Sequence, residues 1–264
     1  MEGEFTMRTL IAIAAACTVA AATHAAVVEE TISYTDGEIE MAGLLAYDDA
    51  IDGPRPAVLV VHEWYGNNEY SHERARMLAE LGYTAFAVDM YGEGLVVDTP
   101  EAAREQVMQV LPDREVIQSR FNAAREWLAA HETADESRMA AIGYCFGGAV
   151  LLELARGGID LAGVVSFHGS LSTGAPAEQG AVNTRILVCH GASDPMIGPE
   201  AVAGFMEEMM EARADIQFIA YPEALHSFTN PDADNPEGGS QYHAEADARS
   251  WEALQAFLDD IFEE

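Results

Sequence analysis

The segment from Met139 to Val150 constrains the fold more than any other part of the chain. It contains an apolar run, a Gly-x-Cys-x-Gly-Gly turn and a second apolar run in direct succession. This order is typical of a buried strand that turns sharply into a helix and exposes a reactive side chain at the turn. The helix is expected at about residues 146–156, so its free amides and positive dipole end would face Cys145 and favour a thiolate there. Three glycines leave room for the turn: Gly143, Gly147 and Gly148.

A buried structural cysteine is the alternative, because free cysteine is among the most buried residue types. A nucleophile also needs a histidine to exchange its proton and an acid to orient that histidine, in the chain order nucleophile, acid, histidine. Asp194 follows the strand-like run 185–190, and His226 follows the run 216–221. Because the carboxyl ends of parallel strands share one edge of a sheet, we expect Cys145, Asp194 and His226 to meet there.

Other polar residues at strand ends compete for these roles. His62, His168 and His190 each end an apolar run, where a single histidine is more commonly a hydrogen-bonded packing residue. Asp89 is alternatively a carboxylate that caps its loop, and Asp194 could itself brace its turn in the same way. Cys189 lies inside its predicted strand and is interpreted as a core residue.

Three motifs together resemble the dienelactone hydrolase family of α/β-hydrolases, whose nucleophile is cysteine. They are the Gly-Tyr-Cys-Phe-Gly-Gly turn, the His-Gly-Ala-Ser-Asp-Pro turn at 190–195 and the Leu-His-Ser-Phe loop at 225–228. The resemblance runs from about residue 28 to the end of the chain. It implies that Cys145, Asp194 and His226 hydrolyse carboxylic esters or lactones through a covalent acyl-enzyme.

A fourth element of the resemblance is the strand and loop at Ala57–Gly66, which carries Glu63. In this family the corresponding glutamate is held near the resting thiol and accepts the thiol proton when substrate displaces it. A solvated or structurally paired carboxylate is the alternative for Glu63. The resemblance also assigns the two oxyanion donors to the backbone N–H groups of Trp64 and Phe146. The side chains expected to line the substrate pocket, beside Trp64, are Tyr65, Tyr91 and Phe228.

The chain departs from family members that act on dienelactone itself. Those members hold the substrate carboxylate with two arginines, one in the loop after the fourth strand and one just after the catalytic histidine. The corresponding stretches here, 89–95 and 226–230, contain no arginine. Glu93 and the acidic surface would repel an anion. We therefore expect a neutral and fairly small ester or lactone, with short acyl chains preferred because no cap domain is available to cover a long one.

Composition supports one catalytic domain at residues 26–264. The chain has 45 acidic residues against 13 lysines and arginines, a formal net charge of −32. This excess argues against nucleic acid and anionic membrane surfaces as partners, and it suggests a saline habitat in which salt screens the self-repulsion. No metal or cofactor is expected, because His62-Glu63 lacks the second histidine of a zinc helix and neither a phosphate loop nor a dinucleotide fingerprint occurs. The sequence indicates no oligomeric state.

The first 25 residues are typical of a secretory signal peptide. Met7–Ala25 has one basic residue, a short apolar run and small residues before Ala26, while residues 1–6 resemble an upstream extension. Cys17 makes a lipoprotein site the alternative. Export would place Cys145 and Cys189 in an oxidising compartment, yet we expect them to stay unpaired because a bond between them would destroy the nucleophile.

The expected fold is an α/β-hydrolase fold with a mainly parallel sheet of about eight strands, flanked by helices and without a large cap domain. Strands are predicted at 28–34, 40–47, 57–61, 83–88, 139–144, 163–167, 185–190 and 216–220, and helices at 69–81, 114–131, 199–212 and 242–261. Residues 66–68 and 91–100 are predicted to be loops around the pocket. Two other functions fit the same sequence motifs: a thioesterase or acyl transferase, and an exported binding protein whose active site is no longer functional.

Overall fold

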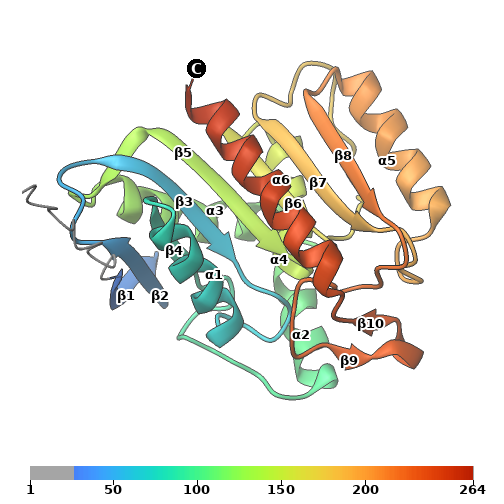
Figure 1. The fold of residues 1–264 in the computed structure, drawn as a ribbon, viewed down its shortest axis with the longest axis horizontal. Coiled ribbons are helices and arrows are strands. Elements are labelled where there is room, and N and C mark those ends of the chain that lie inside the picture. The colour runs from blue at the N-terminus through green and yellow to red at the C-terminus, as the bar shows by residue number, and fades with distance from the viewer. Residues whose placement is uncertain (1–26, 264) are drawn as a thin grey trace, which may run out of the picture.

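An eight-stranded sheet forms the centre of the structure, a computed structural model that describes residues 27–263 (Figure 1). Its strand order is β1-β2-β4-β3-β5-β6-β7-β8. The strands are β1 Val27–Asp36, β2 Ile39–Asp48, β3 Arg55–Val61, β4 Thr84–Val88, β5 Ala134–Tyr144, β6 Gly163–Phe167, β7 Arg185–Gly191 and β8 Ile216–Tyr221. The predicted leader at residues 1–25, with Cys17, lies outside the described residues.

The first two strands, both predicted, form an antiparallel hairpin around Asp36 and Gly37, and β2 is also antiparallel to β4. All the remaining pairs in this sheet, from β4 through β8, are parallel. The mainly parallel sheet and the α/β-hydrolase-like arrangement are therefore confirmed. Parallel strands end at the same edge, which brings together the loops that follow β3, β5, β7 and β8.

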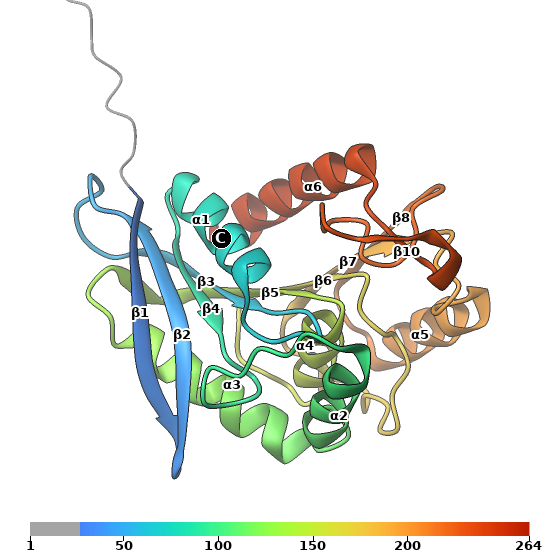
Figure 2. The ribbon, with the colours of Figure 1, turned by 90° about the horizontal axis from the view of Figure 1, so that it is seen from below.

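Helices cover both faces of the sheet, as Figure 2 shows most clearly. They are α1 Glu69–Glu80, α2 Pro100–Val110, α3 Arg114–Ala129, α4 Phe146–Arg156, α5 Pro199–Ala212 and α6 Ala244–Glu263. Side chains of β3 alternate between two cores. Leu59 belongs to the core that includes residues of α3, α4 and α5, whereas Val58 belongs to the core that includes residues of α1 and α6. Burial on both faces explains why these strands are continuous apolar runs in the sequence.

The largest differences from the sequence prediction are the start of β5 and the presence of α2, which was not predicted; the other predicted ends shift by at most two residues. Strand β5 begins at Ala134 rather than 139, because it also includes the polar residues Asp135–Arg138. Its pairing with β3 shifts in register between Pro56 and Ala57. Helix α2 follows a segment predicted to be a loop, and its start is fixed by the Thr99 hydroxyl, which accepts from the amide of Ala102. Within residues 27–263 no helix is both long and apolar enough to span a bilayer.

Candidate active site

The turn between β5 and α4 has the strained geometry that its glycines predict. Cys145 adopts φ 53° and ψ −109°, a conformation that side chains rarely take. A Cβ atom on Gly147 would lie 2.3 Å from the Val61 carbonyl oxygen, and one on Gly143 would lie 2.4 Å from the backbone of Gly147. Glycine is therefore required at both positions, and the packing holds Cys145 at the first turn of α4.

The side chains of Cys145, His226 and Asp194 lie within hydrogen-bonding range of one another. His226 Nε2 is 3.1 Å from the Cys145 sulfur, and His226 Nδ1 is 2.8 Å from Asp194 Oδ2. The other oxygen of Asp194 accepts from the amide of Met196 at 2.8 Å, so the turn after β7 fixes the carboxylate. Three residues that are far apart in the sequence thus form one chain of hydrogen bonds at the edge where the parallel strands end.

The charges around His226 favour its protonated form. Burial lowers the pKa of His226, but the neighbouring Cys145 charge and the hydrogen bonds to Asp194 and Cys145 outweigh it, so the pKa is raised well above its ordinary value. An imidazolium beside sulfur is the arrangement that lets one ring first stabilise a thiolate and then donate a proton.

The backbone of His226 is also held, by residues 239–241, for which the sequence predicted no element. The His226 amide donates to the carbonyl of Gly239 and its carbonyl accepts from Gln241, which gives an isolated bridge between His226 and Ser240. This segment belongs to a small hairpin, β9 Asp234–Asn235 and β10 Ser240–Gln241. No local sequence pattern indicates this contact, because the bonded residues come from separate loops.

Glu63 is buried beside the same loop and is held by two donors. Ser227 Oγ donates to one carboxylate oxygen at 3.0 Å, and Asn230 Nδ2 donates to the other at 2.6 Å. Burial raises the pKa of Glu63, although these two bonds and the His226 charge oppose the rise. The sulfur of Cys145 is hydrogen-bonded to His226 and not to Glu63 in the described chain. The carboxylate therefore lies beside the His226 loop and makes no hydrogen bond with the thiol in the described chain.

The two amides expected to bind an oxyanion are free to do so. Among residues 27–263, the backbone N–H groups of Trp64 and Phe146 have no protein acceptor. Trp64 lies in the loop after β3, and Phe146 is the first residue of α4, where helix amides are unpaired. Both residues adjoin groups of the site, Glu63 on one side and Cys145 on the other.

The competing strand-end residues have structural partners. His168 Nδ1 accepts from the amide of Cys145 at 3.1 Å, and its Nε2 is 2.7 Å from the Thr229 hydroxyl. His190 packs against the ring of Phe218. The carboxylate of Asp89 accepts from four backbone amides, those of Ala42, Tyr91, Gly92 and Gly94, and so caps its loop. Cys189 is a free thiol in the core, as interpreted, and burial raises its pKa to about 12.

The three predicted pocket residues differ in position. Tyr65 is partly exposed, and the charges of Cys145 and Glu63 both act on its hydroxyl. Tyr91 is mostly buried and donates to the Trp64 carbonyl at 2.8 Å. The prediction for Phe228 is wrong: this side chain is fully buried against His168 and Tyr221 and belongs to the core.

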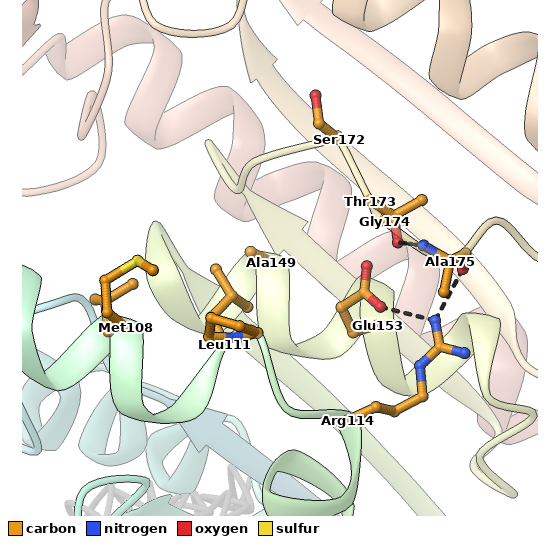
Figure 3. Close-up of a pocket in the computed structure, with 11 residues that line it drawn as sticks. Met108, Leu111, Arg114, Ala149, Glu153, Ser172, Thr173, Gly174 and Ala175 are labelled. Carbon is orange, nitrogen blue, oxygen red and sulfur yellow. Dashed lines mark hydrogen bonds and ion pairs between the residues drawn. The ribbon is translucent and has the colours of Figure 1, made fainter.

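A separate cavity of about 610 Å³ lies beside the helix that follows Cys145 (Figure 3). Its lining comes from α2, the start of α3, α4 and residues 172–175, and includes Met108, Leu111 and Ala149. At one end Arg114 bridges Glu153 and the carbonyl of Ala175. Neither Cys145 nor His226 lines this cavity, so it is distinct from the triad.

Comparison with known proteins identifies the family and agrees with the fold. The sequence profile of the dienelactone hydrolase family matches residues 41–262. A Yersinia pestis protein with the provisional name carboxymethylenebutenolidase is 28% identical over 243 residues, which cover 88% of each chain.

Two solved structures are similar throughout. The structure named m3DLH is 40% identical with a TM-score of 0.85, covering 89% of this chain and 99% of its own. A dienelactone hydrolase-like promiscuous phosphotriesterase from metagenomic libraries is 38% identical with a TM-score of 0.84, covering 90% and 99%. The family profile spans most of the chain, and the neighbours share its α/β-hydrolase architecture. The chain therefore belongs to the dienelactone hydrolase family and is a carboxylic ester hydrolase.

Proposed function

We propose that the protein hydrolyses small neutral carboxylic esters or lactones by two-step acyl transfer through Cys145. The observation that carries the proposal is the pair of hydrogen bonds made by the His226 ring, 3.1 Å to the Cys145 sulfur and 2.8 Å to Asp194. A nucleophile, a base and an orienting acid in this order are the minimum set for covalent acyl transfer.

In the first step the sulfur of Cys145 attacks the carbonyl carbon and forms a tetrahedral oxyanion. The free amides of Trp64 and Phe146 donate to that oxyanion. The carbon–oxygen bond to the leaving alkoxide then breaks, and His226 donates its Nε2 proton to the alkoxide. A thioester on Cys145 and a free alcohol result, or a single ring-opened acyl group when the substrate is a lactone.

In the second step His226 accepts a proton from water, which attacks the thioester carbonyl. The sulfur leaves as a thiolate and the carboxylic acid is released. Asp194 accepts a hydrogen bond from the Nδ1–H of His226, so that Nε2 is the nitrogen that exchanges protons in both steps. When Cys145 begins as the thiol, Glu63 accepts the thiol proton as substrate enters, and it returns that proton to the sulfur after the acid has left.

The arginines around the site support a neutral substrate. Arg74 donates to the Thr229 carbonyl and pairs with Asp247, and Arg120 donates to the carbonyls of Met90 and Tyr91. Both guanidinium groups thus hold the loops in place. Since stretches 89–95 and 226–230 contain no arginine, a substrate carboxylate would have no bidentate partner there.

A phosphotriester is a second candidate substrate class. It is suggested by the 38% identical neighbour, whose name describes it as a promiscuous phosphotriesterase. A neutral phosphotriester suits the same nucleophile and oxyanion donors, because attack on its phosphorus also develops negative charge on an oxygen.

The test is a panel of acetate, butyrate and octanoate esters, small lactones and one phosphotriester, assayed with wild type and Cys145→Ala. We expect turnover that favours short acyl chains, and a loss of at least about 10³-fold in kcat on Cys145→Ala. Mass spectrometry of acid-quenched enzyme should find the acyl group on Cys145. A transferase would instead give a new ester when an alcohol is added.

Cys189→Ala is the matched control, because it removes the other described thiol from the core. It should keep the activity and the acyl adduct. Activity that survives in Cys145→Ala, or an adduct on another residue, would contradict the proposed mechanism.

A further inference from the structure

His62 is fully buried between the end of β3, the loop 89–91 and the start of α4. Its ring packs on the rings of Phe146 and Tyr91, at centroid distances of 5.5 and 4.8 Å. The proposed mechanism does not use this imidazole. Its hydrogen bonds nevertheless reach the chain neighbours of both residues whose amides are assigned to the oxyanion, Glu63 before Trp64 and Gly147 after Phe146.

The tautomer of His62 follows from its partners. The amide of Met90 can only donate, and it lies 3.2 Å from Nε2, so Nε2 must be the acceptor. Nδ1 then carries the proton and donates to the carbonyl oxygen of Glu63. Burial lowers the pKa of His62 to about 4, so the ring is neutral and keeps this arrangement at neutral pH.

The carbonyl of Glu63 and the N–H of Trp64 belong to one peptide unit. The described chain contains no cis peptide, so these two groups point in opposite directions from a common plane. A donor that fixes the Glu63 carbonyl on one side consequently fixes the direction of the Trp64 N–H on the other. The same hydrogen bond polarises the peptide and strengthens that N–H as a donor.

His62 also sets the position of the second amide. Its own carbonyl accepts from Gly147 at 3.1 Å, one residue beyond Phe146, and its ring stacks on the Phe146 side chain with an interplanar angle of 25°. The end of β3 and the first turn of α4 are thereby joined through a single residue. The distance between the Trp64 and Phe146 amides depends on these contacts of His62.

We propose that His62 is the positioning residue of the oxyanion hole, which aims the Trp64 N–H through the Glu63 carbonyl and holds it in register with the Phe146 N–H. The inference rests on the proposed function, since it concerns the donors of that reaction. His62 itself touches neither the substrate nor the sulfur in this scheme.

The two amide substitutions of His62 separate its two hydrogen bonds. The side-chain nitrogen of His62→Asn can occupy the place of Nδ1 and still donate to Glu63. The side-chain amide of His62→Gln reaches the place of Nε2 instead, and leaves the Glu63 carbonyl with only the longer hydrogen bond from the Gly66 amide, at 3.3 Å. On a short neutral ester we expect kcat to fall about 10- to 100-fold in His62→Gln, because loss of a whole oxyanion donor costs about 10²–10³-fold. We expect His62→Asn to stay within about 3-fold of wild type, with KM nearly unchanged in both.

Two further measurements distinguish a change in the direction of the Trp64 N–H from a general disruption of the folded protein. Alkylation of Cys145 by iodoacetamide needs a reactive thiol but no oxyanion donor, so its rate should be the same in wild type and both variants. Binding of a trifluoromethyl ketone, which forms a tetrahedral oxyanion on the sulfur, should weaken in His62→Gln by the same factor as kcat/KM.

Equal kcat in the two variants, or a fall in alkylation that matches the fall in turnover, would overturn the inference. If either variant does not fold, ¹⁵N-histidine spectra of the wild type decide: we expect one ring protonated at Nδ1 that does not titrate between pH 5 and 8, and its absence would also overturn the inference. Failure of the proposed function looks different, because the wild type itself would then turn over no ester.

Discussion

The Nε2 nitrogen of His226 lies 3.1 Å from the sulfur of Cys145, within hydrogen-bonding range. This contact joins the turn after β5 to the loop after β8, which are 81 residues apart. It makes the protonation state of the ring and the state of the sulfur depend on each other. The consequences can be tested by changing the groups that hold the ring, rather than the ring itself.

Replacing Asp194 with Asn should shift the alkaline limb of the kcat profile to lower pH. The hydrogen bond to Asp194 and its negative charge both raise the pKa of His226, so their loss lowers that pKa. In the proposed mechanism the imidazolium protonates the leaving alkoxide, and this form of the ring would be lost at a lower pH. We also expect kcat at its optimum to fall about 10²- to 10⁴-fold, as in other triads whose acid is neutralised. An alkaline limb at its wild-type position would contradict this role for Asp194.

The elements that bring Cys145, Asp194 and His226 together could be predicted because each is a local pattern. The glycine-flanked turn at Cys145 and the apolar runs before Asp194 and His226 are readable in the sequence, and a parallel sheet brings their ends together. Helix α2 was not among the predicted helices. Its only strong signal is the Thr99-Pro100 start, an N-cap followed by a proline at the first helical position.

The direction of a side chain in a loop could not be predicted in the same way. Phe228 follows Ser227, whose φ of 51° turns the chain so that the ring enters the core instead of lining a pocket. His168, with φ 41°, reaches the Cys145 amide for a comparable reason. Such backbone angles arise from tertiary packing, and no periodicity in the sequence records them.

Glu63→Gln tests whether this carboxylate accepts the thiol proton. Burial raises the pKa of Glu63, so the ionised form that can accept a proton is lost on acidification at a higher pH than for an ordinary glutamate. We expect kcat/KM of the variant to fall about 10- to 100-fold, and its acidic limb to disappear.

Ser227→Ala is the matched control for Glu63, because it keeps the carboxylate and removes one donor to it. That donor lowers the pKa of Glu63, so the acidic limb should move to higher pH while activity at pH 8 is retained. The pH profile of kcat/KM for the three proteins measures both effects. An acidic limb that is identical in all three would mean that Glu63 is a structural carboxylate.

Thr229→Val tests the support behind the nucleophile turn. The Thr229 hydroxyl is 2.7 Å from both His168 Nε2 and the Tyr70 hydroxyl, and His168 in turn accepts from the Cys145 amide. Valine leaves two buried polar groups without a partner, which should cost about 1–3 kcal/mol of unfolding free energy. We expect a lower Tm and slower alkylation of Cys145, because the turn is less firmly held.

Thr229→Ser keeps the hydroxyl and loses only a methyl group, so it should stay within about 1 kcal/mol of wild type. Thermal unfolding and iodoacetamide kinetics of the two variants provide the comparison. Equal losses in valine and serine would show that packing of the methyl group, rather than the hydrogen-bond chain, accounts for the effect.

Gly239→Ala should damage activity more than its strain alone explains. Gly239 has φ 86°, accepts from the His226 amide, and would place a Cβ atom 2.4 Å from Pro195, the residue after Asp194. Alanine there must displace either the Asp194 turn or the segment that holds His226, so the Asp194–His226 hydrogen bond should lengthen and kcat should fall.

Gly180→Ala is the matched control, because Gly180 has φ 79° and nothing within 4 Å of the added Cβ. Both variants should lose about 1 kcal/mol or more of stability from the left-handed backbone. Only Gly239→Ala should also lose kcat, measured at a temperature where both are folded. A Gly239→Ala enzyme with the kcat of Gly180→Ala would mean that this segment does not position the histidine.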